Sequence, residues 1–350
     1  MFPYWVLFMM FAAGAVAVRD QPNGVAQSRP LLFFATMLMA LFIGLRFEVG
    51  PDWTSYLELY KAASRLDLGD LIGHDDPGFY ALMWLGRRLQ VEIWALNLAC
   101  AAIFSSGLLA FARRQPNPWL AIAVAVPYLV IVVAMSGTRQ ATAIGFVFLG
   151  LAAFIDKKLY RFMFWVMCAS LFHASALLMV VIVGLSYTRN RFQSIVLLCI
   201  AAFPAYYILS ASFEVYITRY GNAKIQSEGT IYRVMMNFIP AVYLLLNFKK
   251  FSSELHEHVL WRNLAFIAII CVPLMLLVPS STALDRVSLY VIPLQIYVLA
   301  RIPALFSADT KEYLVTTVGI IGLLACVMWV YFMFSTHGEY YIPYRFYPIL

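Results

Sequence analysis

The sequence predicts an all-α polytopic membrane protein. Of its 350 residues, 63% are hydrophobic and only 12% are charged. Apolar runs long enough to cross the hydrocarbon core of a bilayer recur along the whole chain. We therefore expect one integral membrane domain over residues 1–350, a bundle of about 10 to 12 transmembrane helices, with short or re-entrant helices around a cavity that faces the outer, periplasmic side. The formal charge of +7 does not indicate a nucleic-acid partner, because cytoplasmic loops of membrane proteins are rich in Lys and Arg.

The apolar runs place the helices in order. We expect spans at residues 2–18, 31–45, 93–111, 119–134, 139–155, 192–210, 234–248, 264–278, 287–302 and 313–334, and a half-buried helix at 77–89. Residues 162–187 could form one helix, but that crossing would put Arg189 and Arg191 outside. Two short, re-entrant helices bent near residues 172–175 keep both basic ends inside, and we prefer this interpretation.

The polar segments give the expected sides of the membrane. Residues 46–76 form the first large polar segment, which is acidic. We place residues 46–92, this loop with its interfacial helices, on the outer side. Within it, Trp53, Tyr56 and Tyr60 recur at helical spacing, which predicts an amphipathic helix at the interface. The basic loops at 113–114 and 156–161 are expected inside. Residues 340–350, rich in Tyr and Pro, are typical of an interfacial strap.

A charged residue at the mouth of an apolar helix is the first candidate for function. Residues 134–145 end one span, turn the chain and begin the next, and Arg139 lies at that turn. The planar guanidinium group of arginine binds phosphate or carboxylate through two parallel hydrogen bonds. The alternative is that Arg139 only holds the helix end at the lipid headgroups.

Other polar residues gather at the same outer side under this topology. Three arginines with an Asp and a His suit a polyanionic headgroup such as a diphosphate, and arginine would also stabilise charge on a departing diphosphate. The Asp or His could accept a proton from a sugar hydroxyl. Alternatively, the carboxylate is a solvated loop residue, the His a packing residue and the late Asp-Arg a surface pair. These residues are Arg46, Asp52, Arg139, His173, Asp285 and Arg286.

Six short stretches, in order, resemble the signature motifs of one family. They are Arg46-Phe-Glu-Val-Gly-Pro-Asp52-Trp-Thr-Ser-Tyr56, Asp76-Pro-Gly-Phe-Tyr80, Ser136-Gly-Thr-Arg139-Gln140, Phe172-His173-Ala-Ser-Ala176, Asp285-Arg286-Val-Ser-Leu-Tyr290 and Ile342-Pro-Tyr344. They are similar to those of EpsG-type proteins, which belong to bacterial exopolysaccharide and O-antigen clusters and are grouped with the Wzy polymerases. Asp76 stands where that family usually has Glu, so the role of this carboxylate does not carry over.

The resemblance implies a periplasm-facing glycosyltransferase of the bacterial inner membrane. It would move the growing glycan from undecaprenyl diphosphate onto an incoming lipid-linked repeat unit, without cofactor or metal. A chain-length regulator is a candidate partner.

The roles that we expect follow from this reaction. Arg139 and Arg286 would bind the donor diphosphate, and Arg46 would assist them or hold the loop. Asp52 is the first candidate for the base and His173 the second. The expected sugar contacts are Tyr56, Gln140 and Tyr290.

Three other functions stay open. A flippase for lipid-linked oligosaccharide would also use arginines, but it predicts charges along a path through the bilayer or inverted repeats. A membrane O-acyltransferase needs a histidine with a catalytic partner, and the stretch around His173 offers none. An O-antigen ligase or another lipid-linked glycosyltransferase is chemically close to a polymerase, and the sequence hardly separates them.

Overall fold

The computed structural model describes residues 1–18, 22–65, 67, 69, 73–74, 76–187, 229–251, 255–277 and 281–347. In this part of the chain the elements are helices, apart from an isolated antiparallel bridge between Arg46 and Phe346. The predicted all-α class is therefore confirmed. The predicted span at 192–210, with Arg189 and Arg191 before it, lies outside the described residues. Contacts divide the chain into two compact units, which we describe separately: Met1–His173 with Ala300–Leu350, and Ala174–Leu299. The single domain stays a prediction.

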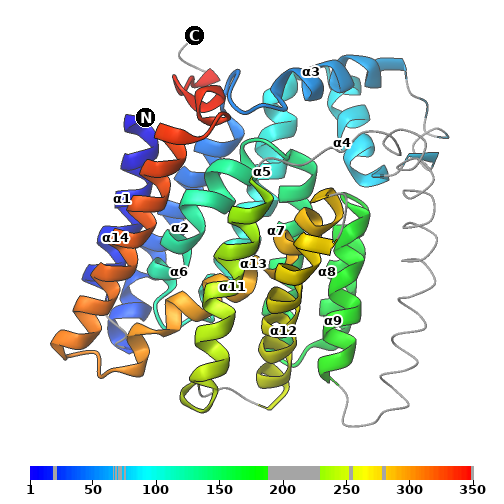
Figure 1. Cartoon of the computed structure of the whole chain (residues 1–350). Coiled ribbons are helices and arrows are strands. Elements are labelled where there is room, and N and C mark those ends of the chain that lie inside the picture. Colours follow the sequence, from blue (N-terminus) through cyan, green and yellow to red (C-terminus); the bar gives the residue numbers. More distant parts are fainter. Residues whose placement is uncertain are drawn as a thin grey trace. The chain divides into compact units, whose positions relative to one another are not determined.

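The first unit holds the helices around the candidate site (Figure 1). They are α1 (Phe2–Ala17), α2 (Pro22–Gly44), α3 (Trp53–Ala62), α4 (Pro77–Arg88), α5 (Ile93–Ala112), α6 (Pro118–Ala125), α7 (Thr138–Ile155), α8 (Leu159–Ser170) and α14 (Lys311–Phe334), and a π-helical turn at Val126–Ala134 continues α6. The predicted amphipathic helix is present as α3, with Trp53, Tyr56 and Tyr60 buried on one face.

Several helices have the length and composition of membrane spans. Among the described residues, α5, α7, most of α12 (Leu255–Leu277) and α14 are long and apolar enough to cross a bilayer. Five shorter apolar helices of 10–17 residues accompany them. These features define a multi-pass membrane protein.

Helix α7 lies against α5 with no side chain between the two backbones. A Cβ atom on Gly145 would lie 2.5 Å from the Cα of Phe104, and one on Gly107 would overlap the Gly145 carbonyl. Small residues allow membrane helices to approach this closely. This contact fixes how far α7 is shifted along its axis relative to α5, and it therefore fixes the positions of both ends of α7.

The end of the described chain closes over the loop that follows α2. Residues 340–347, which we call the C-terminal strap, accept and donate backbone hydrogen bonds with residues 45–50 (Figure 1). Gly50 N–H donates to the Tyr340 carbonyl at 2.9 Å, and Tyr347 N–H donates to the Leu45 carbonyl at 2.8 Å. The Tyr344 ring stacks on Phe42 with centroids 4.2 Å apart. The strap expected from the Tyr-rich sequence therefore packs on the loop that carries Arg46 and Asp52.

The second unit contains α9 (Leu178–Tyr187), α11 (Thr230–Leu246), α12 and most of α13 (Ser281–Arg301). Helix α12 packs against α11 and α9. The break predicted near 172–175 is confirmed, because α8 ends at Ser170 and a 3-10 turn at Ala174–Leu177 precedes α9. The predicted starts of the last two helices of this unit, 264 and 287, are wrong.

Both helices begin earlier than predicted, because charged residues end a hydropathy pattern without ending a helix. In α13 the charged pair Asp285-Arg286 lies inside the helix, and Asp285 is neutralised there by an ion pair with Arg233 at 2.8 Å. A paired carboxylate is tolerated at a buried helical position, although its hydropathy alone predicts a loop.

Candidate functional site

The site in the first unit is built on the turn before α7. Gly50 has a φ of 96° and packs so closely on the Met135 carbonyl that a Cβ atom there would overlap it. This close approach carries the loop after α2 onto residues 135–136. As a result, the Ser136 hydroxyl donates a hydrogen bond of 2.7 Å to an Asp52 carboxylate oxygen. Asp52 itself is exposed to solvent.

Arg139 lies in the first turn of α7 and contacts three side chains, one on α3 and two at the start of α4. Its Nη1 donates to Asp76 Oδ2 at 2.7 Å. The guanidinium carbon lies 5.9 Å from the Tyr56 ring centroid and 6.0 Å from that of Phe79, within the range of cation–π attraction. The Arg139 side chain is 36% exposed, whereas the Asp76 side chain is only 10% exposed. The carboxylate is thus a fixed support, and the guanidinium still faces solvent.

Asp76 is a site residue that sequence reasoning did not assign. It occupies the N-cap position of α4, before Pro77, but its side chain does not cap that helix. The Asp76 carboxylate forms an ion pair with Arg139 instead. The family-like stretch at 76–80 is the signal that could have found it. Sequence alone could not pair a carboxylate at position 76 with an arginine at position 139.

Arg46 is buried, with 2% of its surface exposed. Its Nη1 donates to the Ile43 carbonyl at 2.7 Å, and its Nη2 donates to the Thr138 hydroxyl at 2.9 Å. Burial lowers the pKa of Arg46, because desolvation disfavours the charged form. The group therefore links the end of α2 to the first residue of α7. This geometry agrees with the expected role of holding the loop.

Tyr56, expected to contact sugar, lies beneath Arg139. Its hydroxyl accepts the Arg139 backbone N–H at 3.4 Å, and its side chain is buried. Burial raises the pKa of Tyr56, and the neighbouring Arg139 offsets part of this rise, so the phenol is neutral near pH 7. Gln140, the next residue on α7, is half-buried.

His173 belongs to a segment that reaches the start of α4. The Gly78 N–H donates to the Leu171 carbonyl at 2.8 Å. Leu171 lies two residues before His173, and Gly78 lies two residues after Asp76. The His173 side chain is half-buried. The segments that carry Arg46 and Asp52, Asp76, Arg139 and His173 therefore come together in one unit.

The remaining predicted residues lie on α13 in the second unit. Arg286 is exposed, whereas Tyr290 is buried and its hydroxyl accepts a hydrogen bond of 3.3 Å from Ser175. Asp285 pairs with Arg233 at the start of α11, a residue to which the sequence assigned no role. The sequence also predicts an outer loop between the spans at 192–210 and 234–248, and its charged residues Glu214, Arg219 and Lys224 lie outside the described residues.

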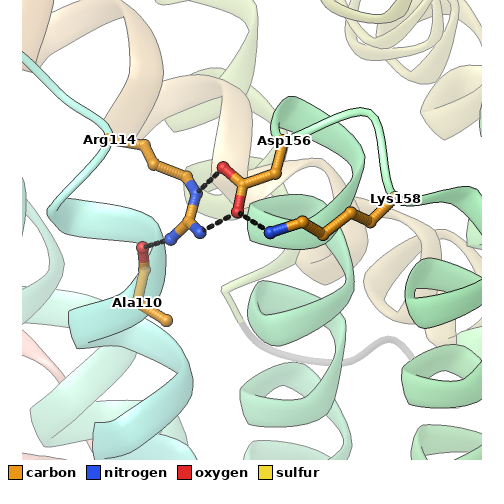
Figure 2. Close-up of polar contacts among 4 residues, drawn as sticks. All are labelled: Ala110, Arg114, Asp156 and Lys158. Carbon is orange, nitrogen blue, oxygen red and sulfur yellow. Dashed lines mark hydrogen bonds and ion pairs between the residues drawn. The ribbon is translucent and has the colours of Figure 1, made fainter.

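The opposite end of α7 carries a different ion pair (Figure 2). Arg114, after α5, donates from Nε and Nη2 to both oxygens of Asp156, at 2.8 and 2.5 Å, and from Nη1 to the Ala110 carbonyl. Lys158 Nζ lies 3.6 Å from the same carboxylate. The two loops expected on the cytoplasmic side are therefore adjacent, at the end of α7 away from Arg139.

These observations define a multi-pass membrane protein with an arginine-centred polar site at one end of its helices. The chain belongs to the EpsG family, whose model matches residues 30–346. This is the family of Wzy-type polysaccharide polymerases, and the resemblance seen in the sequence is confirmed. The protein is thus a membrane protein of the polysaccharide-polymerase, glycosyltransferase-like type. No curated protein and no solved structure gives a match.

Proposed function

We propose that the protein is a lipid-linked polysaccharide polymerase of the bacterial inner membrane. It transfers the growing glycan from undecaprenyl diphosphate to the incoming lipid-linked repeat unit at the periplasmic face. One observation carries the proposal: the Arg139 guanidinium is held on a buried carboxylate and yet remains 36% exposed at the start of α7. An arginine in this state is oriented for an anion that arrives from outside.

The position of Arg139 on its helix supports an anionic ligand. The amino end of a helix carries a partial positive charge, which disfavours a cation and favours an anion. Arg139 lies in that first turn, with the buried Arg46 bonded to the neighbouring Thr138. A diphosphate there meets the guanidinium and the positive end of α7 together.

The proposed reaction is one displacement at the anomeric carbon. A base accepts the proton of an acceptor sugar hydroxyl, whose oxygen bonds to the anomeric carbon of the donor glycan. The bond from that carbon to the diphosphate oxygen breaks, and the electron pair leaves with the diphosphate. Arg139 stabilises the charge that develops there. Asp52 and, second, His173 are our candidates for the base.

A ligase that transfers finished glycan to another acceptor would use the same diphosphate clamp, by which we mean Arg139 held on Asp76 at the start of α7. A flippase fits less well with the first unit. Between the two charged ends of α7, the helix from Ala141 to Phe154 is mostly buried and carries no charged residue. This favours chemistry at one face over a charged path along α7.

The test compares two arginines at opposite ends of α7. Delete the gene, restore wild type, Arg139→Ala or Arg114→Ala, and separate the surface glycans on a gel. We expect Arg139→Ala to reduce polymer at least about a hundredfold, as loss of a transition-state donor does, leaving single capped repeats. Arg114→Ala should give a full ladder, and all three proteins should reach the membrane in equal amounts.

Other results would contradict the proposal. A full ladder from Arg139→Ala would show that Arg139 does not bind the donor diphosphate. In the deletion strain, lipid-linked units trapped on the inner face would indicate transport. Full-length polymer of altered mass in that strain would indicate a decorating acyltransferase.

A further inference from the structure

The second unit contains a polar seam between α11 and α13, made of Arg233 and Asn237 on α11 and Asp285 and Ser288 on α13. Arg233 Nη1 pairs with Asp285 Oδ2 at 2.8 Å. One turn further along, Asn237 Nδ2 donates to the Ser288 carbonyl at 2.8 Å. Residues one turn apart share a helix face, so these contacts form a continuous row.

Three buried side-chain oxygens of this seam make no hydrogen bond in the part of the chain that the structure describes: the acceptors Asp285 Oδ1 and Asn237 Oδ1, and the Ser288 hydroxyl. Asp285 is 6% exposed and Asn237 is 2% exposed. A buried acceptor without a donor costs free energy, and native proteins rarely leave one in that state. The seam therefore suits a ligand that donates hydrogen bonds, as sugar hydroxyl groups do.

One cation of this seam, Arg233, and one residue beside it, Arg286, are accessible to a ligand. The Arg233 side chain is 23% exposed above its buried carboxylate partner, and Arg286 next to that partner is exposed. This repeats the arrangement of Arg139 on Asp76, a partly exposed guanidinium on a buried carboxylate. Each arginine also lies in the first turn of a helix that follows a glycine, Gly229 for α11 and Gly137 for α7.

We infer that the α11–α13 seam is a second binding site for a sugar diphosphate headgroup. Arg233 and Arg286 bind the diphosphate, and Asp285 and Asn237 accept hydrogen bonds from sugar hydroxyls. The inference rests on the proposed function, in which a donor and an acceptor, each a lipid diphosphate, must be bound at once. It assigns Arg286 to this second headgroup rather than to the one held by Arg139.

The number of bound lipids tests the inference. Purify the full chain in detergent and measure, by native mass spectrometry, how many molecules of undecaprenyl diphosphate bind at saturation. We expect two lipids bound to the wild type, one to Arg139→Ala, one to Arg233→Ala and none to the variant that combines Arg139→Ala with Arg233→Ala. Arg262→Ala, which removes an exposed arginine from α12 in the same unit, is the matched control and should bind two. Phosphatidylglycerol in place of the diphosphate should give neither step.

Two further variants keep the result interpretable if Arg233→Ala does not fold. Arg286→Ala leaves the Arg233–Asp285 pair intact and should weaken the second binding step about tenfold. Arg233→Met with Asp285→Leu removes both buried charges together, a change that proteins often tolerate, and should bind one lipid. Two lipids bound to this double variant would overturn the inference.

The two proposals fail in different ways. A wild type that binds one lipid, lost in Arg139→Ala, overturns the second site and leaves the polymerase clamp standing. Unchanged binding in Arg139→Ala with one lipid lost in Arg233→Ala overturns the clamp instead. A wild type that binds no diphosphate lipid overturns both, and the seam is then an ion pair with buried water.

Discussion

The two ends of α7 both carry an ion pair, and both place a charge where the helix dipole opposes it. Arg139 lies at the positive amino end, and Asp156 follows the negative carboxyl end. At the carboxyl end, three nitrogens of Arg114 donate to protein acceptors (Figure 2). The Arg114 and Asp156 side chains are about equally exposed, at 27% and 31%. At the amino end, Arg139 is 36% exposed on a partner that is 10% exposed.

This difference separates a structural arginine from one prepared for a ligand. A guanidinium whose three nitrogens each donate to protein is held by protein groups on every side and has fewer N–H groups left for a substrate. One that is fixed by a buried carboxylate and open on its other side is oriented in advance for an anion, which lowers the cost of ordering it on binding. Four predictions test this comparison, from the largest expected effect to the smallest.

Substitution of Gly145 in the middle of α7 should have the largest effect, because its contact with α5 determines the positions of both ends of α7. Gly145→Leu inserts a side chain against the Phe104 backbone and should cost about 1–3 kcal/mol or more of folding free energy. Thermal unfolding in detergent measures this loss. Gly319→Leu is the control, because a Cβ atom on Gly319 meets nothing within 4 Å. Equal stability of the two variants would show that α5 and α7 are not in backbone contact.

Removing a carboxylate should affect activity at one end of α7 alone. Asp76→Asn keeps the size of the side chain but loses the charge that orients Arg139. Polymer formation should fall about 10–100-fold, the range found when a residue that orients a metal ligand is removed. Asp156→Asn should leave the glycan ladder unchanged. If both variants reduce polymer equally with normal protein levels, the comparison between the ends is wrong.

Thr138 should matter through the buried arginine beside it. Thr138→Val removes the hydroxyl that accepts from Arg46 Nη2 and leaves a buried charged donor without a partner. The expected loss of stability is about 1–3 kcal/mol, measured by thermal unfolding. Thr138→Ser retains the hydroxyl and should be near wild type. A normal melting temperature for Thr138→Val would mean that Arg46 finds another acceptor.

The Arg114–Asp156 pair should give the smallest effect, visible as a pH dependence. Hydrogen bonds from Arg114 lower the pKa of Asp156 below its usual 3.8. The pair therefore contributes stability above that value and loses it as the pH falls through the lower folded-state pKa. Surface pairs contribute about 0–1 kcal/mol. Wild type should melt slightly above Asp156→Asn near neutral pH, and the difference should shrink below about pH 4.

Much of the fold follows from the sequence, whereas the partners of the charges do not. Hydropathy predicts α5, α7 and α14 within two residues, because long apolar runs have one stable state in lipid. It places the start of α13 too late, because the charged pair Asp285-Arg286 interrupts the hydropathy pattern without interrupting the helix. The convergence of Arg46, Asp52 and Arg139 was predicted from motifs and topology. Their tertiary contacts were not, because pairing depends on the close crossing at Gly145 and on the turn at Gly50.

The carboxylate of Asp76 illustrates the limit. From sequence, residues 52 and 76 are two acidic positions in one polar segment, and Asp52 follows Gly50-Pro51, a pair that favours a turn. In the structure, Asp52 is exposed on Ser136, and Asp76 is buried against the arginine. Burial distinguishes the two, and burial depends on how α4 packs against residues 171–172, which no local pattern encodes.

The C-terminal strap has a consequence for how the chain is made. Its Arg345 pairs with Glu48, and the two residues are 297 positions apart. At about 5–20 residues per second, the ribosome reaches position 345 roughly 15–60 s after position 48. During that interval the loop with Arg46 and Asp52 is already synthesised, but its backbone partners do not yet exist. The loop with Arg46 and Asp52 therefore gains its contacts with the strap only after helices α1 to α14 have all been synthesised.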